Sequence, residues 1–302
     1  MKRFALACIA ISALAGAAPA RADSSTGGAF ILPGYGARAW GMAGAVSAVI
    51  DDESALDWNP ARISLAARSL GASYVNLVPG ASLGQAQLAF VMPLSQPANG
   101  VATHAVGAMF SNLSADIAGG TSYSENHLRA VYAYTPQPLV SVAIAGQAFF
   151  SRGDIGGFDA WGTSVDFAGR LSLSKNWDLG AVGKDMFSRY SFDDGRDSHK
   201  ETSVVLGIAT RRIPMVTLSA DVVRQYASWT RALFGFETVY LVDHLALRGG
   251  LAMNRAGESR TAVSFGASLR AWNARLVVHY GATLDDETAF GTTHRVSLGV
   301  RM

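Results

Sequence analysis

Residues 263–274 read VSFGASLRAWNA, and this stretch shows how most of the chain is built. Apolar or small side chains occupy every second position from Val263 to Leu269, and mainly polar ones lie between them. The run ends at a short turn, Trp272-Asn273-Ala274. Two-residue alternation is the period of a β-strand with one apolar face. The stretch therefore predicts a strand followed by a tight turn.

The same alternation recurs in residues 165–173, 216–222 and 296–302. A soluble β-sandwich would share this period, but its strands usually run only about 5–6 residues. Here the alternating runs extend over roughly 10–14 residues, and about 9–11 are enough for a strand to cross a bilayer. Helical spans are excluded, because they need about 18 or more consecutive apolar residues and the chain has no such stretch.

The connections between these runs differ in length and polarity. Short turns are expected at residues 95–100, 136–138, 174–176, 212–214, 241–243 and 272–274. Longer or more polar loops are expected at residues 78–83, 114–122, 152–159, 190–200, 226–229, 254–259 and 284–291. Short periplasmic turns alternating with long external loops are typical of outer-membrane barrels. The sequence thus predicts an all-β fold, a transmembrane antiparallel β-barrel of about 14 strands over residues 69–302.

The composition agrees with a membrane protein of this class. Of 302 residues, 49% are hydrophobic and only 16% charged, and the formal net charge is +2. A disordered chain would need low hydrophobicity and high net charge. Nucleic acid is not an expected partner, since the chain has no basic run and its 25 basic residues nearly balance 23 acidic ones.

Residues 1–22 have the form of an export signal. Lys2 and Arg3 precede an apolar run from Phe4 to Ala18, and small residues follow at a cleavage site after Ala22. An uncleaved anchor is the alternative, but the run is shorter than the ~20 residues of a membrane span. Cys8, the only cysteine, lies within this run, so the mature chain is expected to lack disulfides and cysteine-based metal sites.

Residues 23–68 do not alternate. They include GARAWGMAGAVSAVIDDESALDWNPARIS over residues 36–64. This stretch resembles the N-terminal hatch signature of the FadL-like outer-membrane superfamily, in which three short motifs follow one another closely. The matching positions are Arg38, Gly41, Met42, Gly44, Asp51, Asp52, Asn59, Pro60 and Ala61. Arg62 departs from the pattern, which usually has glycine there.

Within the superfamily, LVDHLALRGGLAM (residues 241–253) and HRVSLGVRM (residues 294–302) most resemble the PorV-type branch. The resemblance implies that residues 23–68 fold as a hatch inside the barrel, with the Asn-Pro-Ala motif at its turn. In fatty-acid transporters of the superfamily, hydrophobic substrates pass the hatch and leave through a lateral opening in the wall. In the PorV branch the barrel serves protein secretion or surface anchoring as a carrier or scaffold.

Two functions therefore stay open. The first is a conduit for hydrophobic small molecules such as fatty acids, and the alternative is a non-conducting scaffold for a secreted or partner protein. An apolar pocket beside the hatch and a break in the wall would favour the conduit. A lumen filled with paired charges and an unbroken wall would favour the scaffold.

Four arginines at predicted lumen positions are candidate ligand-binding residues, because guanidinium groups bind carboxylates in bidentate fashion. They are Arg129, Arg170, Arg248 and Arg270. The structural alternative is that they pair with lumen carboxylates such as Asp166, Asp221 and Glu237, since an unpaired buried charge is costly.

The C-terminal strand carries a predicted assembly signal. Large side chains recur at every second position, at His294, Val296, Leu298, Val300 and Met302. Barrels of this class usually end on an aromatic residue that the barrel-assembly machinery reads, and Met302 takes that place here. The expected partners are this machinery and outer-membrane lipid, and the expected location is the outer membrane of a Gram-negative-type cell.

Enzyme motifs are missing from the sequence. The six histidines show no metal-ligand spacing, and no Gly-x-Ser-x-Gly occurs. Ser264 or Ser268 with His279 could form a hydrolase pair only on the outer wall. The sequence therefore predicts no catalysis, no cofactor and no metal site.

Overall fold

The computed structural model describes residues 34–77, 83–95, 100–117, 121–154, 159–225, 229–238, 244–256, 258–273, 275–285 and 292–302. The expected signal at residues 1–22, with its cleavage site after Ala22, lies outside these ranges, and so do residues 23–33 of the expected hatch.

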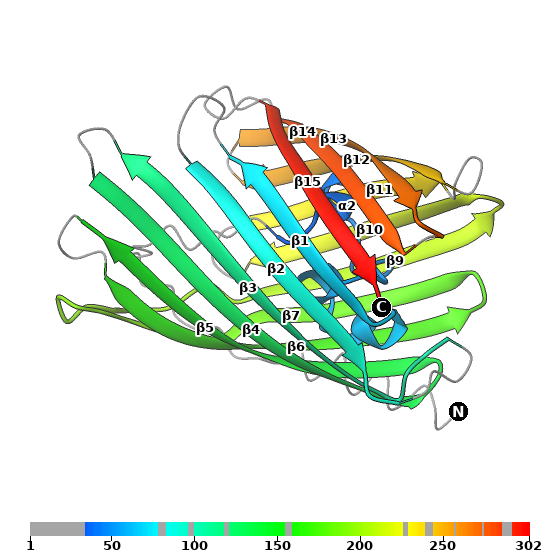
Figure 1. The fold of residues 1–302 in the computed structure, drawn as a ribbon, viewed down its shortest axis with the longest axis horizontal. Coiled ribbons are helices and arrows are strands. Elements are labelled where there is room, and N and C mark those ends of the chain that lie inside the picture. The colour runs from blue at the N-terminus through cyan, green and yellow to red at the C-terminus, as the bar shows by residue number, and fades with distance from the viewer. Residues whose placement is uncertain are drawn as a thin grey trace.

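A closed antiparallel barrel makes up most of the molecule (Figure 1). Its 14 strands are β1 (Ser69–Asn76), β2 (Leu83–Pro93), β3 (His104–Ile117), β4 (Thr121–Gln137), β5 (Val140–Gly153), β6 (Ala160–Ser174), β7 (Trp177–Phe192), β9 (Ser203–Ile213), β10 (Val216–Gln225), β11 (Trp229–Thr238), β12 (Leu245–Ala256), β13 (Glu258–Ala271), β14 (Leu276–Asp285) and β15 (Thr292–Arg301). The two-residue β8 (Asp197–Ser198) pairs only with β7. Pairing of β1 with β15 closes the ring, so the predicted fold is confirmed.

The strands reach further than the loop pattern predicted. β3 continues to Ile117 and β4 begins at Thr121, within the stretch expected as a loop over residues 114–122. β12 and β13 likewise take up most of residues 254–259. The difference arises because polar residues are not confined to loops. In a barrel, polar side chains continue up the strands on the lumen face.

The outer face of the barrel is apolar. Leu70, Leu88, Leu269 and Val296 are each at least half exposed, and they belong to four different strands. The neighbouring positions point inward, as Ser268 and Ser297 do, so the alternation predicted from the sequence is confirmed. Among the described residues, no helix has the length and apolar character needed to cross a bilayer.

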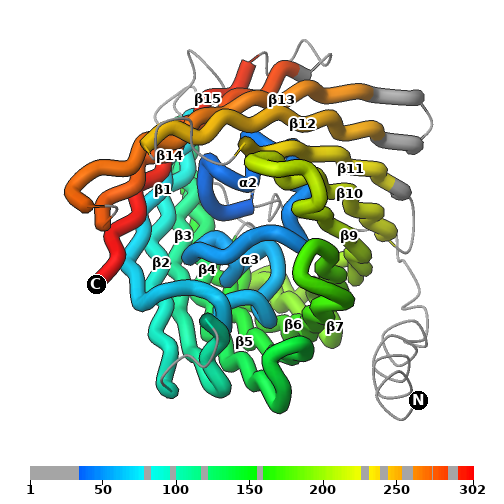
Figure 2. The backbone as a smooth tube through the Cα atoms, turned by 90° about the vertical axis from the view of Figure 1, so that its right-hand side faces the viewer, coloured from blue at the N-terminus to red at the C-terminus, as the bar shows by residue number. Residues whose placement is uncertain are grey.

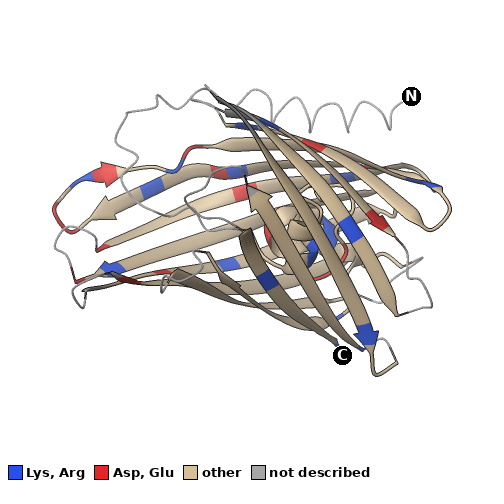
Figure 3. Ribbon diagram, turned by 90° about the horizontal axis from the view of Figure 1, so that it is seen from above, with Lys and Arg blue, Asp and Glu red and all other residues tan. Residues whose placement is uncertain are grey.

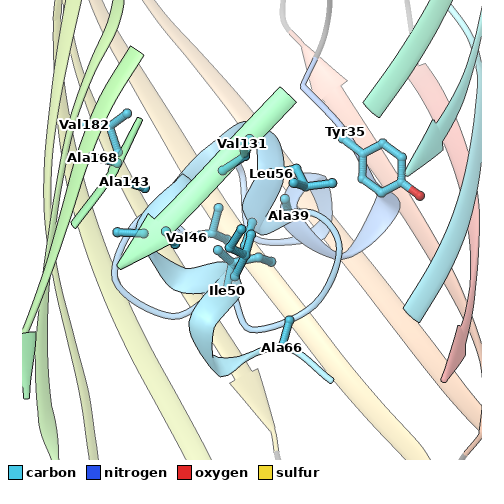
Figure 4. Close-up of a cluster of buried hydrophobic side chains, with 14 of the residues drawn as sticks. Tyr35, Ala39, Val46, Ile50, Leu56, Ala66, Val131, Ala143, Ala168 and Val182 are labelled. Atoms are coloured by element: carbon cyan, nitrogen blue, oxygen red, sulfur yellow. The ribbon is translucent and has the colours of Figure 1, made fainter. Parts of the chain in front are cut away.

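The described part of the N-terminal segment, residues 34–68, lies inside the ring of strands (Figure 2). We call it the hatch segment. It contains the helices α2 (Ala37–Gly41) and α3 (Ala55–Trp58) and the 3-10 helix η1 (Pro60–Leu65). Val46, Ile50 and Leu56 are fully buried and pack with wall residues of several strands, including Val131, Ala143, Ala168 and Val182 (Figure 4).

Small lumen-facing residues let the hatch segment approach the wall. A side chain added at any of nine wall glycines would contact hatch atoms. Gly107 of β3 lies against the Leu56 side chain, and we call the other eight the glycine collar: Gly71, Gly180, Gly207, Gly235, Gly250, Gly266, Gly281 and Gly299. Several of them face one another across neighbouring strands, as Gly235 and Gly250 do. The collar spans β1, β7, β9, β11, β12, β13, β14 and β15. The hatch backbone therefore seats against bare main chain around this part of the barrel.

β7 is irregular in its C-terminal half. Its pairing with β6 shifts register twice, between Thr163 and Val165 and between Val165 and Phe167. Asp185 and Phe187 have φ angles of 54° and 56°, a conformation that is costly for residues other than glycine. β7 also loses its other partner here, because the ladder with β9 stops at Lys184 and Ser203 and pairing resumes only with β8, at Tyr190 and Ser198. We call residues 185–189 the wall break.

Candidate functional site

The arginine of the hatch motif organises an ion-pair network. Arg38 extends from α2 and contacts three carboxylates, at 2.5 Å from Asp51, 2.9 Å from Asp52 and 3.0 Å from Glu237 of β11. Arg248 of β12 lies 3.3 Å from the other oxygen of Glu237. Burial acts to raise the pKa of Asp52, but the Arg38 guanidinium, His279 and the hydrogen bonds from Arg38 and the Ser54 amide together lower that pKa to about 2. Two motifs 13 residues apart in the chain are thus joined to each other and to the wall.

The Asn-Pro-Ala motif forms the second anchor of the hatch segment. The side-chain Oδ1 of Asn59 accepts a hydrogen bond from the Ala61 amide, which caps η1. The Asn59 amide group donates to the carbonyl of Ser47 at 2.7 Å and to the carbonyl of Gly169 in β6 at 3.2 Å. The fully buried Asn59 therefore joins two turns of the hatch segment to the wall.

The glycine and methionine of the motif serve close packing. Gly41 lies against Gly266, and the backbone of Met42 lies against Gly235 and Gly250. Gly44 has a φ angle of 77°, which favours glycine. These positions fit the predicted hatch motif, and their place in the lumen explains why small residues are needed there.

The four candidate arginines do not gather in one site. Arg129 pairs with Asp57 of the hatch segment at 2.7 Å and with Asp166 of β6. Arg248 pairs with Glu237 and donates to Ser268 at 2.5 Å, and Arg270 lines a cavity of about 80 Å³ beside Arg38. Arg170 lies near the short turns, where its guanidinium donates to the carbonyl of Pro138. Most of these contacts join wall to wall or wall to hatch, which favours the structural alternative for Arg129 and Arg248.

Figure 3 shows where charge lies in the barrel. Basic and acidic positions surround the helical segment in the lumen and mark strand ends, whereas most of the wall is uncharged. This arrangement is expected for an apolar outer surface with paired charges inside.

Ser268 and His279 are hydrogen-bonded, but on the lumen side. The Ser268 hydroxyl contacts His279 Nδ1 and also accepts from Arg248, and Ser268 is only 1% exposed. Ser264 instead bonds with Thr283. Ser268 and His279 therefore do not lie on the outer wall, where a hydrolase pair would have to be. Among the described residues, no group of three or more histidine, cysteine or acidic side chains could hold a metal ion.

An aromatic cluster lies behind the wall break, and the sequence did not reveal it. Phe149, Ala160, Tyr190 and Phe192 are buried together. Lys200 Nζ lies 3.8 Å from the Phe149 ring centroid and 3.7 Å from Asp185. Tyr190 is 2% exposed and faces inward, on the same face of β7 as Asp178 and Val182. The one signal available was the adjacent charged pair Lys184-Asp185, which interrupts the alternation.

The buried carboxyl group of Glu53 is expected to make the stability of the folded protein depend on pH. Its buried side chain fills the space beside Gly71 and Gly299, at the seam of β1 and β15. Burial and the nearby Asp52 carboxylate raise the pKa of Glu53 from 4.5 to about 8. The folded protein thus retains a proton that the unfolded chain releases, so the contribution of Glu53 to stability is full below about pH 4.5 and is lost as pH rises to about 8.

We expect Glu53→Gln to flatten this dependence, because the amide stays neutral. Thermal unfolding of the detergent-solubilised protein between pH 5 and pH 8 measures it. The wild-type Tm should fall with pH, and the variant's Tm should fall less. Parallel curves for the two proteins would contradict the assignment.

Comparisons with solved structures agree on the fold. The chain aligns with the Pseudomonas putida toluene transporter TodX at 15% identity and a TM-score of 0.64, covering 89% of this chain and 99% of that one. It aligns with the monoaromatic hydrocarbon channel CymD at 14% identity and 0.65, covering 90% and 97%. A Pseudomonas aeruginosa FadL homologue gives 12% identity and 0.62, covering 89% and 99%. This chain shares the fold of FadL-type channels.

The sequence comparisons add nothing to this. No family model matches the chain, and no curated protein sequence matches it. At these identities the structural likeness establishes the barrel architecture, and it does not distinguish the PorV-type branch from others.

Proposed function

We propose that the protein is an outer-membrane conduit for hydrophobic small molecules, such as fatty acids or aromatic hydrocarbons. In this proposal residues 1–22 are removed on export, the short turns face the periplasm, and the alternating residues from His294 to Met302 are read by the barrel-assembly machinery. The ligand leaves the lumen sideways into the membrane, above the hatch segment. The proteins that share the fold and are named for toluene or monoaromatic hydrocarbons support the substrate class.

The wall break is the observation that carries the proposal. A closed barrel satisfies its backbone hydrogen bonds around the ring, yet here β7 has no ladder partner on one side over residues 185–189. In place of a ladder, the Lys200 amide donates to the Ser188 hydroxyl at 2.8 Å, the Thr202 hydroxyl donates to the Asp185 carbonyl at 3.3 Å, and Arg189 donates to Asp197 at 3.2 Å. The aromatic cluster lies inside the break, and Phe187 is 81% exposed on the outside. Apolar side chains therefore flank the break on both faces.

Stapling the wall break tests the proposal. Ser188→Cys with Lys200→Cys places two thiols on opposite sides of the wall break, at positions where the Lys200 main-chain amide now donates to the Ser188 hydroxyl at 2.8 Å. Cys8 is the only other cysteine in the sequence. Uptake of labelled toluene and a labelled long-chain fatty acid into cells making this barrel should fall at least about 5-fold on oxidation and recover on reduction.

A second staple serves as the matched control. Ser64 of η1 and Ser141 of β5 have their hydroxyl oxygens 3.1 Å apart, so Ser64→Cys with Ser141→Cys ties the hatch segment to the wall. If the ligand leaves laterally, uptake stays intact when this second staple is oxidised. If the ligand passes through the hatch segment, uptake stops. Uptake that is indifferent to the first staple would overturn the lateral route.

One observation favours the scaffold function instead. The charges around the hatch segment are paired with the wall on two sides, through Arg38 with Glu237 and through Asp57 with Arg129. A PorV-like carrier needs no open lumen. If the barrel is correctly folded and uptake is no higher than in cells lacking the protein, the scaffold function is favoured over the conduit.

A further inference from the structure

An open recess of about 460 Å³ lies at the short-turn end of the barrel, between η1 and the wall. It is independent of the wall break and of the aromatic cluster. Four basic side chains line it, Arg62 of η1, Arg170 of β6, Lys175 of the β6–β7 turn and Arg211 of β9. Two carboxylates, Asp51 and Asp178, also line it.

Asp178 is shared among three guanidinium groups. Arg211 donates to it at 2.7 Å, and Arg62 and Arg170 each lie 3.8 Å away. The Ser172 hydroxyl donates to the same carboxylate at 2.5 Å. Asp51 is already paired with Arg38, which lies outside this recess. The basic side chains of the recess therefore exceed its carboxylates by two, and an uncompensated buried cation is costly.

Two of the basic groups keep unused donors. Arg62 is 1% exposed, and its Nε and Nη2 donate to the carbonyls of Ile50 and Val49, at 2.6 Å and 3.1 Å. Its Nη1 is buried without a hydrogen bond, and so is Nε of Arg170, whose side chain is 6% exposed. Burial lowers the pKa of Arg62 to about 9, although the Asp178 and Asp51 carboxylates act to raise it.

We propose that this recess binds a small oxyanion, a carboxylate or phosphate group, between Arg62, Arg170 and Arg211. Guanidinium groups bind such anions strongly because charge reinforces the hydrogen bonds. The bound anion joins the hatch segment to β6 and β9, since Arg62 belongs to the former and the other two arginines to the latter. Binding therefore holds η1 against the wall.

Thermal unfolding of the purified full-length barrel in detergent tests the site, with inorganic phosphate and acetate as separate probes against chloride at equal ionic strength. Phosphate should raise the Tm by at least about 3 °C, because a ligand that binds only the folded state stabilises it. A shift with phosphate alone assigns a phosphate site, and a shift with acetate as well assigns a general carboxylate and phosphate site. No shift beyond chloride with either probe overturns the proposal.

Matched variants separate the recess from general ion effects. Arg211→Gln should weaken phosphate binding, measured by calorimetry, at least 10-fold, and its side chain is 37% exposed, so folding should persist. Arg212→Gln removes the same charge from the adjacent exposed position and should leave binding unchanged. Lys175→Gln is the second recess variant, should Arg211→Gln not fold. Equal binding in the recess variants and Arg212→Gln overturns the proposal.

Maleimide labelling of Ser64→Cys reports on the hatch segment directly. Ser64 lies in η1 and is 2% exposed. Phosphate should slow its labelling at least 3-fold in the single variant, and it should not do so when Arg211→Gln is added. Labelling that phosphate leaves unchanged would contradict the joining of hatch to wall.

Discussion

Replacing Arg38 with methionine should destabilise the folded barrel more than any other single charge removal in the hatch segment. The change leaves Asp51, Asp52 and Glu237 without their shared guanidinium, although Glu237 keeps Arg248. Removing one partner of a buried ion pair costs about 3–5 kcal/mol, since the remaining charge stays buried and uncompensated. The free energy of unfolding in urea, in the presence of detergent or lipid vesicles, measures the loss.

Two further variants make this prediction specific. Arg189→Met removes an exposed arginine that pairs with Asp197 at 3.2 Å, and such surface pairs contribute about 0–1 kcal/mol. Arg38→Lys should rescue little, because an ammonium group does not reproduce the planar fork that reaches three carboxylates. A loss in Arg38→Met no greater than that in Arg189→Met would show that the network does not hold the hatch.

Introducing valine at Gly250 should prevent the hatch segment from seating. A side chain there would overlap the backbone of Met42 and Ala43, and a backbone in a closed ring has little room to yield. Overpacking a buried site costs about 1–3 kcal/mol, and more where backbone blocks relaxation. We expect a lower fraction of the heat-modifiable folded band and a several-fold increase in sensitivity to large antibiotics that leak through an unplugged lumen.

Gly146 provides the matched control for this substitution. It lies in β5, and no atom lies within 4 Å of the position where its side chain would begin. Gly146→Val changes the same residue type in the same kind of strand, and it should leave both measurements near wild type. If the two valine variants behave alike, the glycine collar does not seat the hatch.

The hatch residues could be found from the sequence, and their roles could not. Arg38, Asp52 and Asn59 stood out as motif positions, yet nothing in the chain order predicts that Arg38 meets Glu237, 199 residues away. Arg62 stood out only as a departure from the family pattern. Its contacts with the carbonyls of Val49 and Ile50 and its place in the basic recess appear only in three dimensions.

The sequence by itself determined the barrel, because the two-residue period and the turn spacing are local properties of each strand. It also determined which face of each regular strand meets lipid, as at Leu269 and Val296. The wall break and the shared carboxylate of Asp178 were decided only by the tertiary structure. A register shift depends on how two strands pair, and an ion pair depends on which strands the ring brings together, so neither can be read from one segment alone.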